Sequence, residues 1–588
     1  MAGSLRKTSQ YLLPLHHSGT TPGNYDIYPA HPLPEGEIFT GFTSLAAELM
    51  KQPVVLLDGY IGVFFEDIKA QLIRLFEAQN ITSSWIDISE AMLPETEISR
   101  LTAPFLGGDD PLFGTRTTLT LRDFFDTRKL AAFQKDDSAD ITVVYGCGAS
   151  LCGLNGFAVY ADLPKNELQF RARAGAVTNL GRQKSGDPKA MYKQFYFVDW
   201  VVLNRHKQSL LPLVDILIDA QRPDEITWIN GTHLRKAMQS LSSSVFRVRP
   251  WFEPGTWGGD WMLRNIDGLN PEVPNYAWSF ELIVPENGLL LSHNNSLLEV
   301  SFDTLMFLEA EAVQGDAYQE FGTDFPIRFD FLDTFSGGNL SVQCHPHKEY
   351  TKKHFNENFT QEETYYILDA AEDATVYLGF QEDINPEVFE QALHESFAEN
   401  RELDIEKYVK KLPARKHDLF LIPPGTVHAS GKNNLVLEIS STPYIFTFKM
   451  YDWVRPDLDG KPRPLNIKRA MENLCFDRRG AKVEQELVCR PELIREDETH
   501  RLFHLKTHAR HLYDVHRIHL KSTVVIPTEG KFMVFSLVEG SRVSVTSRNG
   551  ITMYFNYAET FVVPAAAGSV TLANLGGGTA ILVKAFVK

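Results

Sequence analysis

A change in hydrophobic pattern near residue 245 constrains the fold of this chain more than any other feature. Before it, short apolar runs such as residues 53–58 alternate with segments of helical spacing such as residues 63–80. Strands that alternate with helices are typical of an α/β domain with a parallel sheet. After it, short strands follow one another with few helical segments between them, which favours barrels of antiparallel strands. At 588 residues the chain is also too long for a single core.

The pattern predicts a fold class and a division into parts. We expect an α/β N-terminal domain followed by a mainly-β half made of two barrels, with a helical insertion in the first barrel. The insertion begins at Asn385-Pro386, a typical helix start, and is charged on one side. The predicted parts are an irregular arm (1–45), the α/β domain (46–240), a metal-binding barrel (245–455) with its insertion (385–412), a connecting helical segment (456–510) and a second barrel (511–588).

Net charge, apolar content and cysteine count limit the kinds of partner and the cellular compartment that we expect for this chain. The net charge of −17 comes without a basic run, which argues against nucleic acid or an anionic membrane as a partner. No apolar stretch is long enough to span a bilayer, and the first residues lack the apolar core of a signal peptide. Five scattered cysteines fit free thiols in a reducing cytoplasm. Nothing in the sequence specifies an oligomeric state.

Four residues in the first predicted barrel form a candidate metal site. Gln343 and His345 lie two apart on a predicted strand, so both side chains leave the same face. Glu363 opens the next apolar run, and His428 follows a Pro-Pro-Gly turn at the end of a third strand. A histidine in a strand is more often a satisfied polar residue than a ligand. Strand phase and turn chemistry together nevertheless favour a divalent metal site.

At these residues the chain resembles the zinc-dependent class I mannose-6-phosphate isomerases, which are double cupins. The family's Gln-x-His-Pro motif matches Gln343-Cys344-His345-Pro346, its glutamate before an aromatic-rich strand matches Glu363, and its Pro-x-Gly-Thr-x-His-Ala turn matches residues 423–429. The likeness covers about residues 245–588. It implies that Gln343, His345, Glu363 and His428 hold Zn²⁺. It also implies interconversion of mannose 6-phosphate and fructose 6-phosphate through a cis-enediol.

Strand phase adds candidate catalytic residues to the metal ligands. Alternation places Ser341, Glu438 and Lys449 on the pocket face, with Arg328 or Asp330 also possible there. The resemblance places Lys449 where the family has an active-site arginine, and Arg455 where bacterial members also carry arginine. A cation here would steady an enediolate or a phosphate, although lysine lacks the bidentate fork of arginine. The predicted catalytic residues are therefore Ser341, Glu438, Lys449 and Arg455.

Three departures from the family pattern leave other functions open. Asp330 and Gln361 stand where lysines are expected, and Lys449 replaces the arginine. A change from lysine to aspartate disfavours a dianionic phosphate, which predicts an altered sugar or a loss of turnover. The alternative function is therefore a sugar-binding pseudoenzyme or metabolic regulator. An Fe²⁺ cupin oxygenase fits less well because it expects His-x-His where this chain has the glutamine.

The two remaining domains are predicted to lack a site of their own. The α/β domain resembles the P-loop nucleoside kinases, uridine-kinase-like, in its strand–Gly–helix opening and in residues 194–219. After Gly59, however, the chain has Phe64, Phe65 and Glu66 where a phosphate loop needs glycine, lysine and a hydroxyl residue. We expect a degenerate P-loop that serves docking or regulation. The second barrel has Ser569 near the place of the ligand histidine, which predicts a metal-free, structural barrel.

Overall fold

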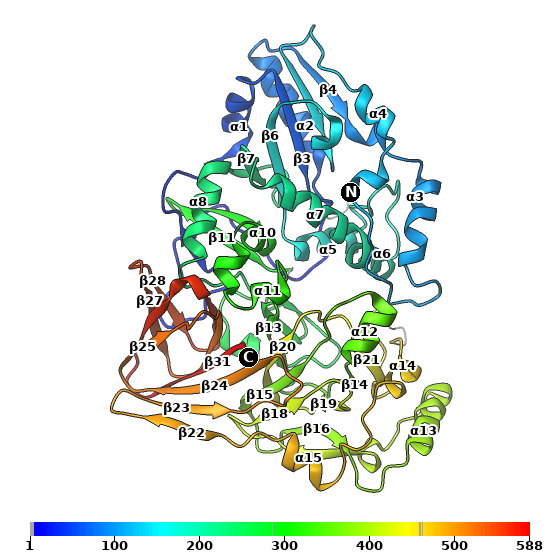
Figure 1. Cartoon of the computed structure of the whole chain (residues 1–588), viewed down its shortest axis with the longest axis vertical. Helices are drawn as coiled ribbons and strands as arrows, with labels where there is room; N and C mark the ends of the chain where they lie inside the picture. The colour runs from blue at the N-terminus through cyan, green and yellow to red at the C-terminus, as the bar shows by residue number, and fades with distance from the viewer. Residues whose placement is uncertain (1–4, 285, 458–459, 461–462) are drawn as a thin grey trace. The chain divides into compact units, whose positions relative to one another are not determined.

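A computed structural model describes residues 5–284, 286–457, 460 and 463–588, and the chain folds into two compact units (Figure 1). The first unit comprises Met1–Gly19, Tyr28–Ser242 and Pro285–Ala310, and the second comprises Thr20–Ile27, Ser243–Val284 and Glu311–Lys588. The chain therefore passes between the units more than once. Both units combine buried apolar strands with polar connections.

The first unit is built on a mainly parallel sheet. Five parallel strands run in the order β7-β6-β3-β5-β4, and β8 and β2 extend the sheet with antiparallel strands. Strand β3 is buried along its whole length, as its uninterrupted apolar sequence predicts. The bounds are β2 (Phe39–Thr40), β3 (Val54–Gly59), β4 (Ser83–Asp87), β5 (Ile141–Tyr145), β6 (Phe157–Asp162), β7 (Ile216–Asp219) and β8 (Thr227–Asn230), with the principal helices α1 (Gly41–Leu49), α2 (Phe65–Ala78), α5 (Lys165–Arg173), α7 (Trp200–Leu210) and α8 (Gly231–Leu241).

The loop after β5 turns its amides toward a carboxylate of the same chain. Asp58, at the end of β3, accepts hydrogen bonds from the backbone N–H groups of Gly148 and Ser150, both at 2.9 Å. His206 Nε2 lies 2.8 Å from the same carboxylate. These groups satisfy one another without a bound anion. The predicted likeness of this unit to P-loop kinases stays a prediction.

One segment departs from the division expected from sequence. Residues 285–310 belong to the first unit, although the sequence analysis assigned them to the first barrel. Strands β11 (Gly288–His293) and β12 (Ser296–Ser301) form a hairpin that pairs with β1 (Ala30–Pro32), and α10 (Phe302–Gln314) follows. The prediction was wrong because an apolar run predicts a buried strand without indicating which sheet it joins.

The first barrel of the second unit consists of two antiparallel sheets. One has the order β18-β15-β20-β13-β10-β9, and the other has the order β17-β16-β19-β14-β21. We call them the acidic sheet and the histidine sheet after the side chains described below. The bounds are β9 (Trp251–Glu253), β10 (Trp278–Leu282), β13 (Ile327–Asp333), β14 (Val342–Cys344), β15 (Glu363–Ala370), β16 (Thr375–Phe380), β17 (Val409–Pro413), β18 (Leu419–Ile422), β19 (His428–Ser430), β20 (Asn434–Ser441) and β21 (Phe448–Tyr451).

The second barrel also pairs two sheets, in the orders β22-β23-β24-β31-β26-β29 and β25-β30-β27-β28. A cluster of buried aliphatic and aromatic side chains, including Phe535, Phe555 and Phe561, forms its core. The bounds are β22 (Glu492–Glu496), β23 (His500–Leu505), β24 (Tyr513–Leu520), β25 (Thr523–Pro527), β26 (Met533–Glu539), β27 (Arg542–Ser547), β28 (Thr552–Asn556), β29 (Thr560–Val563), β30 (Ser569–Asn574) and β31 (Ala580–Val587).

Three further predictions need correction. The arm over residues 1–45 contains β1, β2 and the start of α1. In the insertion, α13 (Pro386–Glu399) begins at its Asn385 cap as predicted, but residues 409–413 form β17 rather than helix. The connecting segment holds α14 (Ile467–Met471) and α15 (Ala481–Glu486), yet it also contributes β22 and β23 to the second barrel. All five residues of β22 are exposed, so the strand lacks the apolar alternation that predicts strands.

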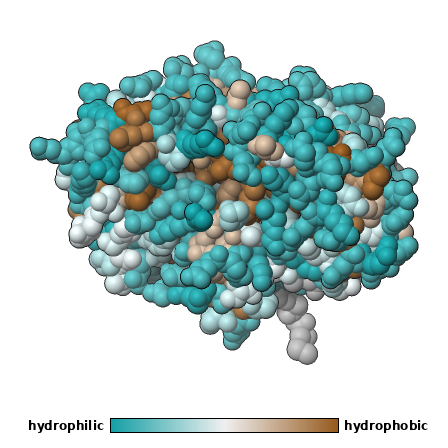
Figure 2. Space-filling model, turned by 90° about the horizontal axis from the view of Figure 1, so that it is seen from below, coloured by the Kyte–Doolittle hydropathy of each residue, from teal (hydrophilic) through white to brown (hydrophobic). Residues whose placement is uncertain are grey.

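Two properties of the described residues concern helix length and surface polarity. None of their helices is long and apolar enough to cross a bilayer. Figure 2 shows one face of the molecule, on which hydrophilic residues dominate and hydrophobic ones occur in small groups.

All five cysteines are free thiols.

Candidate metal centre

One row of side chains crosses the histidine sheet of the first barrel. Gln343 on β14 is paired with His428 on β19 and with Lys449 on β21. Residues that are paired across antiparallel strands project to the same face, so these three side chains lie on one side of the sheet. His345 follows β14 two residues after Gln343. The strand phase used in the sequence analysis therefore describes the geometry of this sheet.

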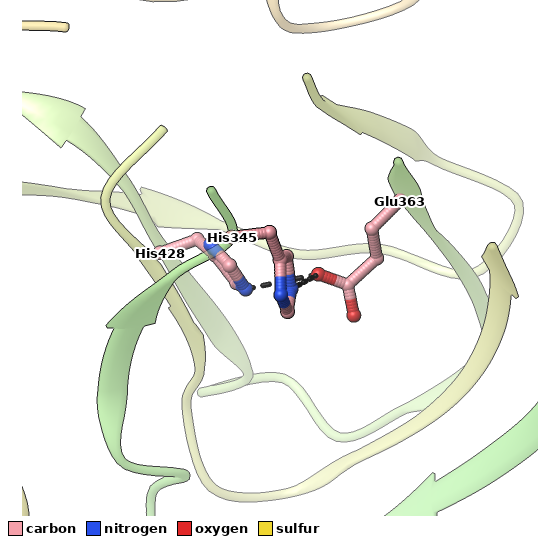
Figure 3. Close-up of side chains that lie close together, drawn as sticks. All are labelled: His345, Glu363 and His428. Carbon is pink, nitrogen blue, oxygen red and sulfur yellow. Dashed lines mark hydrogen bonds and ion pairs between the residues drawn. The ribbon is translucent and has the colours of Figure 1, made fainter. Parts of the chain in front are cut away.

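Glu363 reaches the same place from the acidic sheet. It is the first residue of β15, and its Oε2 lies 2.8 Å from His345 Nε2 and 2.9 Å from His428 Nε2 (Figure 3). All three side chains are at most 1% exposed. The barrel thus brings two imidazoles and a carboxylate together from sequence positions far apart.

The hydrogen bonds of the two imidazoles test whether a cation fits between them. His345 Nδ1 lies 3.2 Å from the carbonyl oxygen of Phe446, and His428 Nδ1 lies 2.9 Å from that of Thr426. A carbonyl oxygen only accepts, so each Nδ1 donates its proton, and in the neutral ring each Nε2 directs a lone pair toward the point where Glu363 Oε2 lies. Burial lowers the pKa of His345, which favours this neutral form. Three electron pairs converging on one point fit a bound divalent cation.

Glu363 itself supports the same interpretation. Burial alone would raise the pKa of this carboxyl, and positive charge on the adjoining His428 and His345 rings lowers it well below its usual range, so the carboxylate is stabilised only when a positive charge lies beside it. Its Oε1 is buried and has no hydrogen-bond partner among the described residues. An ionised, half-satisfied carboxylate in a dry interior is costly unless a cation meets it.

Gln343 is placed to supply a fourth ligand. Its Nε2 lies 3.4 Å from His428 Nε2, a long contact between the carboxamide and the ring. A half-turn of the terminal amide exchanges nitrogen for oxygen at nearly the same position. The Gln343 carbonyl oxygen would then face the point that the two imidazoles and Glu363 share.

Buried charges on the acidic sheet surround Glu363. Glu438 on β20 is paired with Asp330 on β13, and Arg328 forms ion pairs with both carboxyls, at 3.4 Å to Asp330. Burial raises the pKa of Asp330 to about 7, and burial and the neighbouring carboxylates raise that of Glu438 well above its usual value. Three carboxyl groups therefore share one guanidinium. A divalent cation at Glu363 would correct this imbalance.

The Gln361 amide completes this acidic group. Its Nε2 donates to Glu438 Oε1 at 3.2 Å, while its Oε1 is buried without a partner among the described residues. Sequence analysis recognised this position only as a departure from the family pattern. Its contact with Glu438 was not predicted, because the residue lies before the strand whose phase was used.

A second group of cations lies next to the histidine sheet. Lys449 is half-buried, and burial together with Arg463 lowers its pKa to about 8. Arg455 and Arg463 both donate to Asp452, at 2.7 and 2.8 Å. The sequence analysis named Lys449 and Arg455 but missed Arg463 and Asp452. Arg463 returns from a loop, where strand phase carries no information.

Ser341 is buried just ahead of β14, two residues before Gln343. The irregular pairing of β14 with β21 places the extra residue, Met450, on β21, so it does not interrupt the alternation along β14. The structure thus brings together Gln343, His345, Glu363 and His428, with Glu438 and Lys449 close by, and the place of Ser341 on the pocket face stays a prediction.

Comparison with known proteins adds an independent line of evidence. Probable mannose-6-phosphate isomerase GmuF of Bacillus subtilis is 27% identical over 251 residues, which are 43% of this chain and 73% of that protein. Mannose-6-phosphate isomerase ManA of the same organism is 26% identical over 238 residues, which are 40% and 68% of the two chains. Part of the chain is homologous to mannose-6-phosphate isomerases. This supports a sugar-phosphate isomerase.

Two other comparisons concern structure and the N-terminal region. The crystal structure of mannose 6-phosphate isomerase from Bacillus subtilis aligns with a TM-score of 0.47 at 19% identity, covering 58% of this chain and 99% of that one. Variants of phosphomannose isomerase from Salmonella typhimurium align at 0.46 and 14% identity, covering 59% and 100%. Residues 41–243 match the model of a domain of unknown function, DUF8485.

Proposed function

We propose that the second unit is a zinc-dependent aldose–ketose isomerase, acting on mannose 6-phosphate and fructose 6-phosphate. One observation carries this proposal: two imidazoles and a carboxylate converge in the interior of a barrel, and each imidazole is oriented by a backbone carbonyl at Nδ1. Sequence similarity to mannose-6-phosphate isomerases gives the substrate class. The departures at Asp330, Gln361 and Lys449 are then variations within an isomerase rather than signs of lost function.

In this proposal Gln343, His345, Glu363 and His428 hold Zn²⁺. The ion would polarise the oxygen atoms of the sugar and so stabilise the negative charge that develops when a carbon-bound proton leaves. The ligands project inward from both sheets, so the barrel itself fixes their spacing. The carbonyl oxygens of Phe446 and Thr426 fix the ring orientations.

Glu438 is the group best placed to carry a proton. Aldose–ketose isomerisation moves one proton between C1 and C2 and another between the two oxygens. The raised pKa of Glu438 favours its protonated form, from which the carboxyl can donate a proton and later recover it. Arg328 and the Gln361 amide hold the carboxyl in place. We assign no role in proton transfer to Ser341.

Lys449 and Arg455, with Arg463, are proposed to receive the phosphate. The sequence analysis inferred a poor phosphate site from Asp330. The structure gives Asp330 a guanidinium partner and a pKa of about 7, so its charge is largely offset. The cations near the histidine sheet lie in another part of the site. This separation of the cations from the acidic side chains supports a phosphorylated sugar as the substrate.

The test begins with metal analysis of the purified chain and a coupled assay over a panel of aldose and ketose phosphates. We expect bound zinc, turnover of mannose 6-phosphate and exchange of solvent deuterium at C1 or C2. Glu363→Gln should lose both the first-barrel zinc and the activity, whereas the matched change Glu484→Gln at an exposed position should lose neither. Zinc with saturable sugar binding but no turnover of any sugar would establish the alternative, a pseudoenzyme or regulator.

A further inference from the structure

A second group of ligand-type side chains occurs in the second barrel. His504 on β23 and Asp514 and His516 on β24 offer ligand atoms that all lie within 4.8 Å of one another. We call these three residues the second-barrel cluster. None of them matches a position of the first-barrel site. The sequence analysis did not single them out.

Strand pairing explains how the cluster forms. His504 is directly paired with His516, and Asp514 precedes His516 by two residues, so all three side chains share one face of the sheet. On one side Glu492 of β22 is paired with His504, and on the other Lys584 of β31 is paired with His516. A row of four polar residues therefore crosses four strands.

This face of the sheet is the interior face of the second barrel. Ile518 follows His516 by two residues, and Leu582 precedes Lys584 by two, and both belong to the apolar core. Pairing between β24 and β31 is regular along its length, so the faces do not exchange. The cluster therefore lies at one end of the barrel interior, where the apolar filling gives way to polar side chains. A polar group in that position is half-buried.

The contacts within the cluster leave one ligand atom unexplained. His504 Nε2 lies 2.8 Å from Asp514 Oδ2, which alone would be an ordinary ion pair. His516 Nδ1 is also buried, and it has no hydrogen-bond partner among the described residues. An ion pair between His504 and Asp514 gives no reason for a second imidazole, with a buried ring nitrogen that has no hydrogen-bond partner among the described residues, so close by. A shared cation does.

We propose that His504, Asp514 and His516 form a second binding site for a divalent cation of the zinc class. Two imidazoles and one carboxylate suit borderline cations such as Zn²⁺, with the fourth position open to water or to Glu492. Lys584 is paired with His516 from the opposite side, and the carboxylate that acts on its charge is Glu529. The site is independent of the proposed isomerase function.

The bound ion would have a structural consequence. It would connect β23 to β24, and the hairpin of β22 and β23 forms the exposed edge of its sheet. A cation that binds only the folded state stabilises it by mass action. The sequence analysis predicted a metal-free barrel because Ser569 stands near the place of a ligand histidine. That argument does not apply here, because the cluster uses other strands.

The experiment uses the full chain after removal of metal with a chelator. In the Glu363→Gln background only the second-barrel cluster should bind tightly, so titration with Zn²⁺ followed by calorimetry should give one equivalent. Adding His504→Asn and His516→Asn should abolish that equivalent, and adding His394→Asn on an exposed helix position should not. Absence of a bound equivalent in the Glu363→Gln chain would overturn the proposal, as would binding that survives both asparagine changes.

A second measurement covers the case in which a multiple variant fails to fold. The wild-type apo chain should bind two equivalents, and the chain with only His504→Asn and His516→Asn should bind one while keeping wild-type isomerase activity. Zn²⁺ should raise the thermal transition of the wild type by more than that of this double variant. Equal stoichiometry in the two chains would contradict the proposal.

Discussion

The two barrels of the second unit have related architectures, but the interior of the first holds ionisable side chains and the interior of the second is mostly apolar. In the first barrel, charged side chains of the acidic sheet project inward toward polar side chains of the histidine sheet. The charged ones are Glu363, Glu438, Asp330 and Arg328, and the polar ones are His428 and Gln343. In the second, most of the same space is filled by packed apolar side chains. Each pair of sheets supplies inward positions, and the residue types at those positions decide whether the interior holds charge or excludes water.

This difference also separates the forces that hold the barrels together. The second barrel gains stability from apolar burial and from stacked rings, with Phe561 lying 4.0 Å from Phe555 and 5.1 Å from Phe535 between ring centroids. The first barrel buries several ionisable groups, which costs free energy unless they are paired or bound to a cation. Chemistry and stability are therefore tested by different substitutions.

The largest expected effect comes from removing one imidazole of the first barrel. His345→Ala should lose the first-barrel zinc and lower kcat/KM by about 10³-fold or more, because a metal ion contributes several kcal/mol of charge stabilisation. Metal analysis and the coupled assay measure both quantities. The fold should persist, as judged by circular dichroism. Full activity in this variant would remove the metal from the proposed mechanism.

A substitution in the core of the second barrel should lower stability and leave zinc content and activity unchanged. Phe561→Ala leaves a cavity within the stacked rings and should lower the free energy of unfolding by about 3–5 kcal/mol. Denaturant titration measures that loss. At a temperature where the variant remains folded, first-barrel zinc and specific activity should equal those of the wild type. If activity fell with stability intact, the division of roles between the barrels would be wrong.

Removal of the cation beside the metal site should have an intermediate effect. Lys449→Met should lower kcat/KM for a sugar phosphate by about 10–100-fold, the size of a lost charge-assisted contact, and leave zinc content unchanged. Lys411→Met, at an exposed position of β17, is the matched control and should leave kcat/KM unchanged. An equal loss with an unphosphorylated sugar would show that Lys449 acts on the reacting carbons rather than on the phosphate.

The smallest expected effect is a change in the pH dependence of kcat/KM. An ammonium group is charged below its pKa, and the pKa of Lys449 is lowered to about 8, so kcat/KM should fall above that pH and then level off at the value of the Lys449→Met variant. Lys449→Arg keeps the charge at all accessible pH values and should move this alkaline limb upward by more than one pH unit. An unchanged limb in the arginine variant would assign the titration to another group.

Sequence reasoning located the site because strand phase and turn chemistry are local properties. Gln343 and His345 could be placed on one face from their spacing alone, and Glu438 from the alternation of its strand. Arg463 was missed because a loop has no period from which to infer direction. Strand β22 was missed because an exposed edge needs no apolar face.

Several links join the α/β body to the barrels, because the hairpin of β11 and β12 lies downstream of the first barrel strands in sequence yet belongs to the first unit. A gene fragment encoding only the second half would carry this hairpin without its sheet partner β1, and would display leucines that are normally shielded from water. Protease cleavage near residue 242 would give two fragments held together only by non-covalent contacts, because residues 20–27 of the first fragment belong to the second unit and residues 286–310 of the second fragment belong to the first unit. The protein cannot be dissected at a single linker, and each half depends on the other being synthesised.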